Sequence, residues 1–205
     1  MYYAFRSRCI LSLQTLNPSS ITSVFKELLL SYNDFMGNTT FQRLIKKLGQ
    51  KRAQVIAERF VEEFLSPAEA AELTGWTPSE IEDLLANNWH LSGRVGTRRG
   101  GYWAIVPKET LLLGKELPGG KPFLYDELVA EFGHIEADKI IYGLLNDLVD
   151  VREASEATGI PPRTIRYRLG KGAGGKLAKK INAQAPSGTT WAILKDADLT
   201  SDCRQ

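Results

Sequence analysis

The sequence predicts a mainly α-helical protein with small β-hairpins, built from two tandem copies of one small domain after an N-terminal helical segment. Three observations predict this architecture. The chain has 205 residues, of which 43% are hydrophobic and 24% charged, as in globular proteins with two or three small domains. A stretch of twenty residues recurs later in the chain at a constant offset of 84. Each copy of this stretch is followed by a strand-like hairpin segment.

Composition excludes several classes of protein. No apolar run approaches the roughly 20 residues that cross a bilayer, so we expect no integral membrane protein. Cys9 and Cys203 lie near opposite ends and form neither a disulfide framework nor a zinc cluster, which favours a reducing compartment. The net charge of +2 does not by itself indicate a nucleic-acid partner. We expect a cytoplasmic protein.

Two segments precede the first copy. Residues 1–35 are expected to be an N-terminal extension that is either poorly ordered or not native, in which case translation would start at Met36. Residues 36–65 are expected to be helical, with Gly49 dividing them into two helices. Two interpretations of this segment stay open, a packing stripe under a solvated basic face or a dimerisation element. Its apolar residues follow helical spacing: Phe41, Leu44, Ile45, Leu48, Val55, Ile56, Phe60 and Phe64.

The internal repeat defines the domains. Residues 66–85 and 150–169 are identical at eight of twenty positions, and GGYWAI (100–105) then matches GTTWAI (188–193) at an offset of 88. The second copy therefore carries four extra residues between the two matches. Two copies are too few for a solenoid and indicate a duplicated domain. We expect copy 1 at 66–117, a linker with two helices at 118–148, and copy 2 at 149–205.

Each copy has the signals of two short helices joined by a glycine turn. In copy 1, Ser66 and Glu69 form a capping box with Pro67 at the first helical position. Gly75 then allows the tight turn, and Pro78 opens the second helix. Copy 2 repeats this pattern with Asp150, Glu153, Gly159 and Pro162. Two helices joined in this way and followed by a hairpin predict a winged helix-turn-helix.

These motifs resemble known DNA-binding families. The string GRVGTRRGGYWAIVPKETLL (93–112) is similar to the wing and final helix of phage excisionases, and RTIRYR (163–168) resembles the recognition helix of MerR-type regulators. The likeness covers residues 65–113 and 149–200. The chain departs from MerR proteins in having two such domains and no recognisable effector domain, and it is longer than single excisionases. The resemblance implies a bacterial or phage transcriptional regulator, or an excisionase-like architectural factor.

Charge assigns different roles to the two copies. Seven basic residues lie between 163 and 180 without an intervening acid. Basic side chains on a recognition helix and wing suit phosphates and guanine edges, although a solvated basic face is the alternative. We expect Arg163 and Arg166 to contact bases, and Thr164 and Tyr167 to contact bases or the backbone. The predicted DNA-binding set also contains Arg168, with the expected phosphate contacts Lys171, Lys176, Lys179 and Lys180.

Copy 1 carries acidic residues at the positions where copy 2 has its expected DNA contacts. Glu80, Glu82 and Asp83 occupy the positions of Thr164, Arg166 and Tyr167. Carboxylates repel phosphates, so we expect copy 1 to touch DNA only through its wing, in the minor groove, or to bind a protein partner. The basic residues of that wing are Arg94, Arg98 and Arg99.

No catalytic pattern is visible in the sequence. His90 and His134 are isolated, and GKGAGGK fits neither a phosphate loop nor a dinucleotide-binding motif. We expect no enzyme, no cofactor and no metal. The leading hypothesis is a sequence-specific double-stranded DNA-binding protein that is nucleoid-associated in the cytoplasm, with homodimerisation through the segment around 39–65 left open. The alternative is a protein-interaction adaptor of the phage packaging or segregation type, and RNA binding is a weaker third option.

Overall fold

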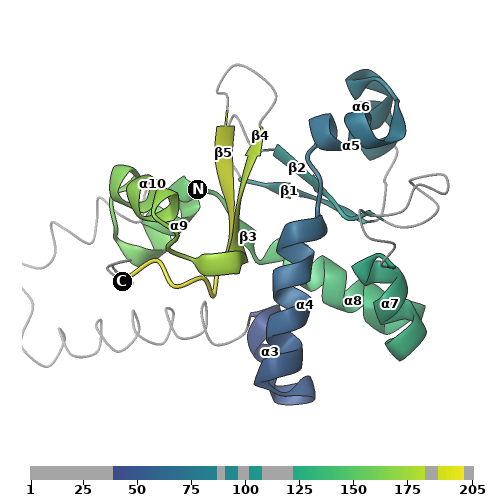
Figure 1. Cartoon of the computed structure of the whole chain (residues 1–205), viewed down its shortest axis with the longest axis horizontal. Helices are drawn as coiled ribbons and strands as arrows, with labels where there is room; N and C mark the ends of the chain where they lie inside the picture. Colours follow the sequence, from purple (N-terminus) through teal and green to yellow (C-terminus); the bar gives the residue numbers. More distant parts are fainter. Residues whose placement is uncertain (1–38, 87–90, 97–101, 108–121, 183–188, 201–205) are drawn as a thin grey trace, which may run out of the picture. The chain divides into compact units, whose positions relative to one another are not determined.

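The computed structural model describes residues 39–86, 91–96, 102–107, 122–182 and 189–200, and these form eight α-helices and two small antiparallel sheets (Figure 1). The mainly helical character and the hairpins that the sequence predicts are confirmed. The predicted extension at 1–35 lies outside the described residues. None of the described helices is long and apolar enough to cross a membrane.

One order of elements occurs twice. The first half contains α3 (Thr40–Leu48), α4 (Gln50–Glu63), α5 (Pro67–Thr74), α6 (Pro78–Ala86), β1 (Ser92–Val95) and β2 (Tyr102–Ile105). The second half contains α7 (Leu124–Phe132), α8 (His134–Asn146), β3 (Leu148–Val149), α9 (Val151–Thr158), α10 (Pro162–Gly170), the 3₁₀ helix η1 (Gly175–Leu177), β4 (Ala178–Asn182) and β5 (Thr189–Leu194). Leu65 pairs with Ile105 as an isolated bridge at the place where the second half has β3.

The repeat is longer than the sequence indicated, because α3–α4 and α7–α8 are also related by the offset of 84. Gly49 and Gly133 join the two helices of each pair at φ angles of 81° and 79°, which glycine adopts readily. Residues 124–146, predicted within a connecting segment, thus form a second copy of 40–62. Equivalent core positions hold residues of similar character: Phe41 and Tyr125, Leu44 and Leu128, Ile56 and Ile140, Phe60 and Leu144.

The predicted helix boundaries follow from local capping. Ser66 and Asp150 each form a capping box with the glutamate three residues later, which satisfies backbone N–H groups at the start of α5 and α9. Gly75 and Gly159 end these helices in the left-handed region, at φ 77° and 73°. The short turns to α6 and α10 follow directly.

The hairpins locate the four extra residues of the second half. β1 pairs with β2 so that Ser92 lies opposite Ile105, and β4 pairs with β5 so that Ala178 lies opposite Ile193. The first strands are therefore related by an offset of 86 and the second strands by 88. Two extra residues precede β4, and two lie in its hairpin loop. β3 adds a third strand by pairing with β5.

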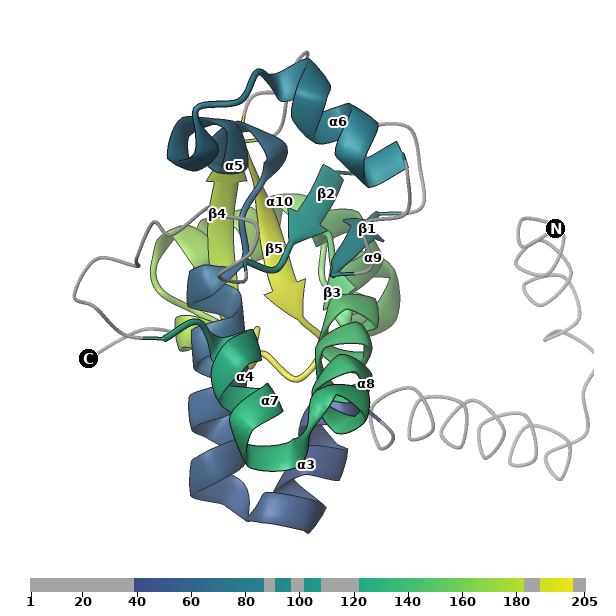
Figure 2. The ribbon, with the colours of Figure 1, turned by 90° about the vertical axis from the view of Figure 1, so that its right-hand side faces the viewer.

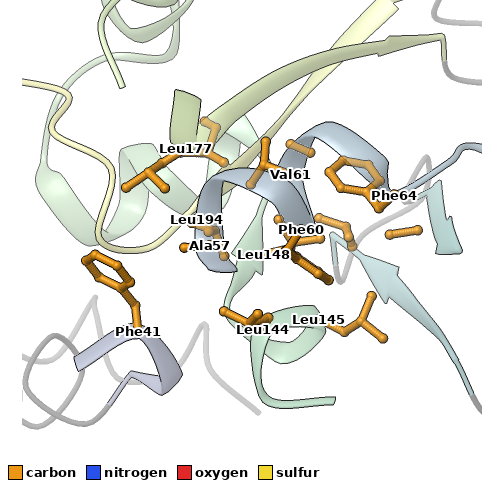
Figure 3. Close-up of a cluster of buried hydrophobic side chains, with 14 of the residues drawn as sticks. Phe41, Ala57, Phe60, Val61, Phe64, Leu144, Leu145, Leu148, Leu177 and Leu194 are labelled. Atoms are coloured by element: carbon orange, nitrogen blue, oxygen red, sulfur yellow. The ribbon is translucent and has the colours of Figure 1, made fainter. Parts of the chain in front are cut away.

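A continuous hydrophobic core joins the two halves (Figure 3). Ala57 and Phe60 from α4 lie in it with Leu144 from α8, and all are at most 1% exposed. Leu194 from β5 belongs to the same core. A second, smaller cluster lies under α5 and α6 and comprises Leu65, Ala70, Ile81, Leu85, Ile105 and Phe123.

The two halves contact each other reciprocally. α4 packs against η1 and β4 of the second half, and α8 packs against β1 of the first half (Figures 1 and 2). Asp147, after α8, accepts a hydrogen bond from the backbone N–H of Thr40 at the start of α3, with an N···O distance of 2.5 Å. Glu63, at the end of α4, accepts one from the N–H of Leu124 at the start of α7, at 2.7 Å. Such reciprocal contacts define an approximate twofold relation between the halves.

Candidate nucleic-acid interface

Helix α10 directs its basic side chains outward. Pro162 opens the helix, and the apolar residues Ile165 and Leu169 are 0% and 3% exposed in the core. One turn of an α-helix is about 3.6 residues, so the intervening positions face away from the core. Arg163 and Arg166 are accordingly exposed. Tyr167 is also exposed, to 68%.

Four exposed cations on and after α10 have no acidic partner within the described part of the chain. Arg163 and Arg166 on the helix, Lys171 after it and Lys180 on β4 are all exposed and make no ion pair with any described residue. Thr164 is half-buried beside them on the same helix. This surface, defined by Arg163, Arg166, Tyr167, Lys171 and Lys180, is called the α10 surface below.

Several cations of α3 and α4 are engaged within the molecule instead. Lys47 pairs with Glu136, Arg52 contacts Glu127 at 3.2 Å, and Arg59 contacts the same Glu127. Burial raises the pKa of Glu127, but hydrogen bonds from Arg59 and Arg52 lower it by a larger amount. The net shift of this pKa is therefore downward. Lys47 therefore joins α3 to α8, and Arg52 and Arg59 join α4 to α7. The other basic residues of this segment, Arg43, Lys46 and Lys51, are exposed and make no ion pair with any described residue.

Lys179, predicted as a phosphate contact, is engaged within the molecule. Its ammonium group donates to the backbone carbonyl of Phe64 at 2.6 Å and lies 3.6 Å from a carboxylate oxygen of Glu69. The same group sits over the ring of Phe64, 4.8 Å from its centroid. Burial lowers the pKa of Lys179, although Glu69 opposes this shift. Lys179 therefore joins β4 to the end of α4 and to α5.

Two other predicted residues have additional roles. Arg168 is half-buried and donates to the backbone carbonyl of Leu199 at 2.9 Å, which ties α10 to the segment after β5. Lys176 pairs with Glu58 at 3.2 Å while its side chain is 79% exposed, so it remains accessible. Neither contact follows from local sequence patterns, because each partner is distant along the chain.

The first half presents carboxylates on the equivalent helix. Ser79, Glu80 and Asp83 of α6 are exposed, whereas the side chain of Glu82 lies outside the described part of the chain. Hydrogen bonds from the backbone and then the hydroxyl of Thr77 lower the pKa of Glu80, so it is a carboxylate at neutral pH.

The two hairpins share a cation in the same register. Arg94 on β1 is exposed and lies opposite Trp103, and Lys180 on β4 is exposed and lies opposite Trp191. Arg98 and Arg99, predicted in the first wing, lie outside the described residues. Both halves therefore keep a positive charge on the hairpin, although α10 is basic and its counterpart α6 carries acids.

Comparisons of the chain with models of known protein families, with curated proteins and with solved structures give no match. The role of the α10 surface is therefore inferred from its own geometry and charge. Within the described residues no group of three or more His, Cys, Asp or Glu side chains is placed to hold a metal ion. The α10 surface offers guanidinium, ammonium and phenol groups, which suit an anionic partner.

Proposed function

We propose that this chain is a double-stranded DNA-binding protein whose two halves are winged helix-turn-helix domains. Helix α10 enters the major groove, and the β4–β5 hairpin contacts the adjacent backbone. One observation carries the proposal: four exposed cations on α10 and on the segment and hairpin that follow it have no acidic partner among the described residues, whereas the equivalent helix α6 carries the exposed acids Glu80 and Asp83. An unpaired cationic helix beside a hairpin is complementary to a groove and its phosphates.

The residues of α10 divide by position. Residues near the start of a recognition helix usually reach base edges, so Arg163 and Arg166 are placed to contact guanine. Tyr167 and Thr164 contact bases or sugar-phosphate beside them. Lys171, after the helix, and Lys180, on the hairpin, contact phosphates, and Lys176 adds to them when its pair with Glu58 opens.

A regulatory or architectural role follows from binding of this kind. A protein that places a helix and a hairpin on DNA acts as a transcriptional regulator or, by deforming the duplex, as an excisionase-like factor. No catalytic step is part of the proposal. The second candidate, a protein-interaction adaptor, is favoured by the exposed acids Glu80 and Asp83 on α6.

The salt dependence of DNA binding tests the proposal. The affinity of the full chain for a random duplex, measured by fluorescence anisotropy over a salt series, should give a log–log slope of about −4, because four or five cations meet phosphate or base edges. An absence of binding at low salt, or an affinity independent of salt, contradicts the proposal.

A charge-reversal variant separates the two candidates. The double substitution Arg163→Glu and Arg166→Glu changes two exposed residues, so circular dichroism should show an unchanged fold. We expect it to abolish DNA binding. Unchanged DNA binding by this variant would remove α10 as the contact, and unchanged function of the variant in the cell would favour the adaptor role.

A further inference from the structure

The chain contains within itself the kind of interface that dimeric DNA-binding proteins form between subunits. Asp147 of the second half caps α3 of the first, and Glu63 of the first half caps α7 of the second. The two acids are related by the offset of 84, and so are the two residues that they cap. Contacts in which each side repeats the other are isologous, as in a twofold dimer. Here both sides belong to one chain.

The apolar faces that would pair two chains are already used in this interface. Ile56 and Phe60 of α4 are 0% and 1% exposed, and Ile141 and Leu144 of α8 are both 0% exposed. α4 also contacts α8 directly. The segment around 39–65, for which the sequence left homodimerisation open, therefore has its partner inside the same chain, in α7 and α8.

The two halves differ at the helix that would contact bases. Ser79 occupies the position of Arg163, and Glu80 that of Thr164. Asp83 occupies the position of Tyr167. The side chains at these three pairs of positions are exposed, except that of Thr164, which is half-buried. Carboxylates on α6 are repelled by the phosphates that line a groove, so α6 cannot make the contacts of α10.

The hairpins differ much less than the helices. Arg94 and Lys180 hold the same register position opposite Trp103 and Trp191. A cation on a hairpin contacts the phosphate backbone without distinguishing bases. Among its described residues, the first half thus retains a cation for backbone contact, while its helix α6 has no basic side chain to contact bases.

We infer that one chain binds one asymmetric DNA site, in which a single tract is recognised by α10 and the first half adds only contacts independent of sequence. This inference rests on the proposed function and specifies its target. Symmetric helix-turn-helix dimers instead bind inverted repeats whose half-sites are one helical turn apart. A single chain in which α10 is basic and α6 is acidic can recognise only one half-site.

Selection of duplexes from a random pool with the full chain, followed by sequencing and native mass spectrometry of the complex, tests this inference. We expect one contiguous motif without an inverted repeat, and one chain per duplex. An inverted repeat, bound by either one or two chains, overturns the inference and leaves DNA binding intact. Failure to bind any duplex overturns the proposed function itself and the inference with it.

Two variants at the same repeat position provide a matched control. Both residues are exposed, so neither Arg163→Ala nor Ser79→Ala should disturb the fold. Arg163→Ala should weaken binding of the selected duplex about tenfold and relax the preference at one base position. Ser79→Ala should leave affinity and preference unchanged. Equal losses in the two variants would show that α6 also recognises bases and would overturn the inference.

Discussion

At the scale of single residues, neighbouring lysines on one strand have opposite roles. Lys179 and Lys180 are adjacent on β4, and side chains alternate between the two faces of a strand. Lys179 therefore points to α4 and α5, where it meets backbone carbonyls at a helix end, and such carbonyls favour a cation. Lys180 points to solvent. In the first half Gly93 takes the place of Lys179, because a side chain there would lie 3.1 Å from Leu145.

Alanine substitutions at these two lysines should separate stability from binding. Lys179→Ala leaves the carbonyls of Glu62 and Phe64 without their donor, so the free energy of unfolding should fall by about 1–2 kcal/mol. The salt slope of DNA binding should not change. Lys180→Ala should leave stability unchanged and flatten the slope by about one. Urea unfolding and salt titrations measure both quantities, and a reversed pattern would mean that the two roles are assigned wrongly.

Glu127 should make the protein sensitive to acid. Its folded-state pKa lies below the ordinary value of 4.5, so its stabilising contribution is complete above pH 4.5 and is lost as the pH falls through the folded-state pKa. Glu127→Gln should cost about 0.5–1 kcal/mol at pH 7, less at high salt because the pair is partly exposed. The variant should also lose less stability than the native chain between pH 5 and 3. Parallel curves for the two proteins would contradict this assignment.

At the scale of elements, local signals predicted some parts of the structure and could not predict others. The capping boxes at Ser66 and Asp150 and the turn glycines define α5, α9 and their turns within a few residues, so sequence alone suffices for them. The repeat of α3–α4 in α7–α8 was not predicted from the sequence. The two helix pairs share their pattern of buried positions more than they share identical residues. β3 was not predicted, because its strand partner β5 is distant along the chain.

The candidate site was likewise predictable only in part. The outward direction of Arg163, Arg166 and Tyr167 follows from helical periodicity, and the structure has this arrangement. The engagement of Lys179 with Phe64 and Glu69 depends on how the halves pack, which no local pattern encodes.

The cap between the halves should be essential to α3. Asp147→Ala removes the carboxylate that accepts from Thr40 and leaves a buried backbone N–H unpaired, so unfolding should become easier by about 1–2 kcal/mol. The neighbouring Asn146→Ala, at an exposed position, is the control and should have little effect. Thermal unfolding measures both, and equal shifts would argue against a specific role for the cap.

At the scale of the whole molecule, the two halves share one main core, while α5 and α6 rest on a smaller one. Ile81 and Ile165 hold the same repeat position at 2% and 0% exposure, but Ile81 belongs to the small cluster and Ile165 to the main core. Regions that rest on fewer buried contacts open at lower free energy than the rest of a fold. We therefore expect α5 and α6 to open at a lower free energy than their counterparts α9 and α10, despite the twofold relation between the halves.

Truncation at this pair of isoleucines should show the difference. Ile81→Ala and Ile165→Ala each remove buried methyl groups, at a typical cost of about 2–4 kcal/mol. Hydrogen exchange should accelerate only within 66–86 for Ile81→Ala and throughout α4, α8 and α10 for Ile165→Ala. DNA binding should survive the first change. Global acceleration in both variants would show that α5 and α6 unfold together with the main core.

Hydrogen exchange of the full chain with and without duplex DNA tests the central claim most directly. If the α10 surface enters the groove, backbone amides of 163–171 and 178–181 gain protection on binding, while those of α6 do not. Protection centred on α6, or none at α10 under conditions where the duplex is bound, would contradict the account.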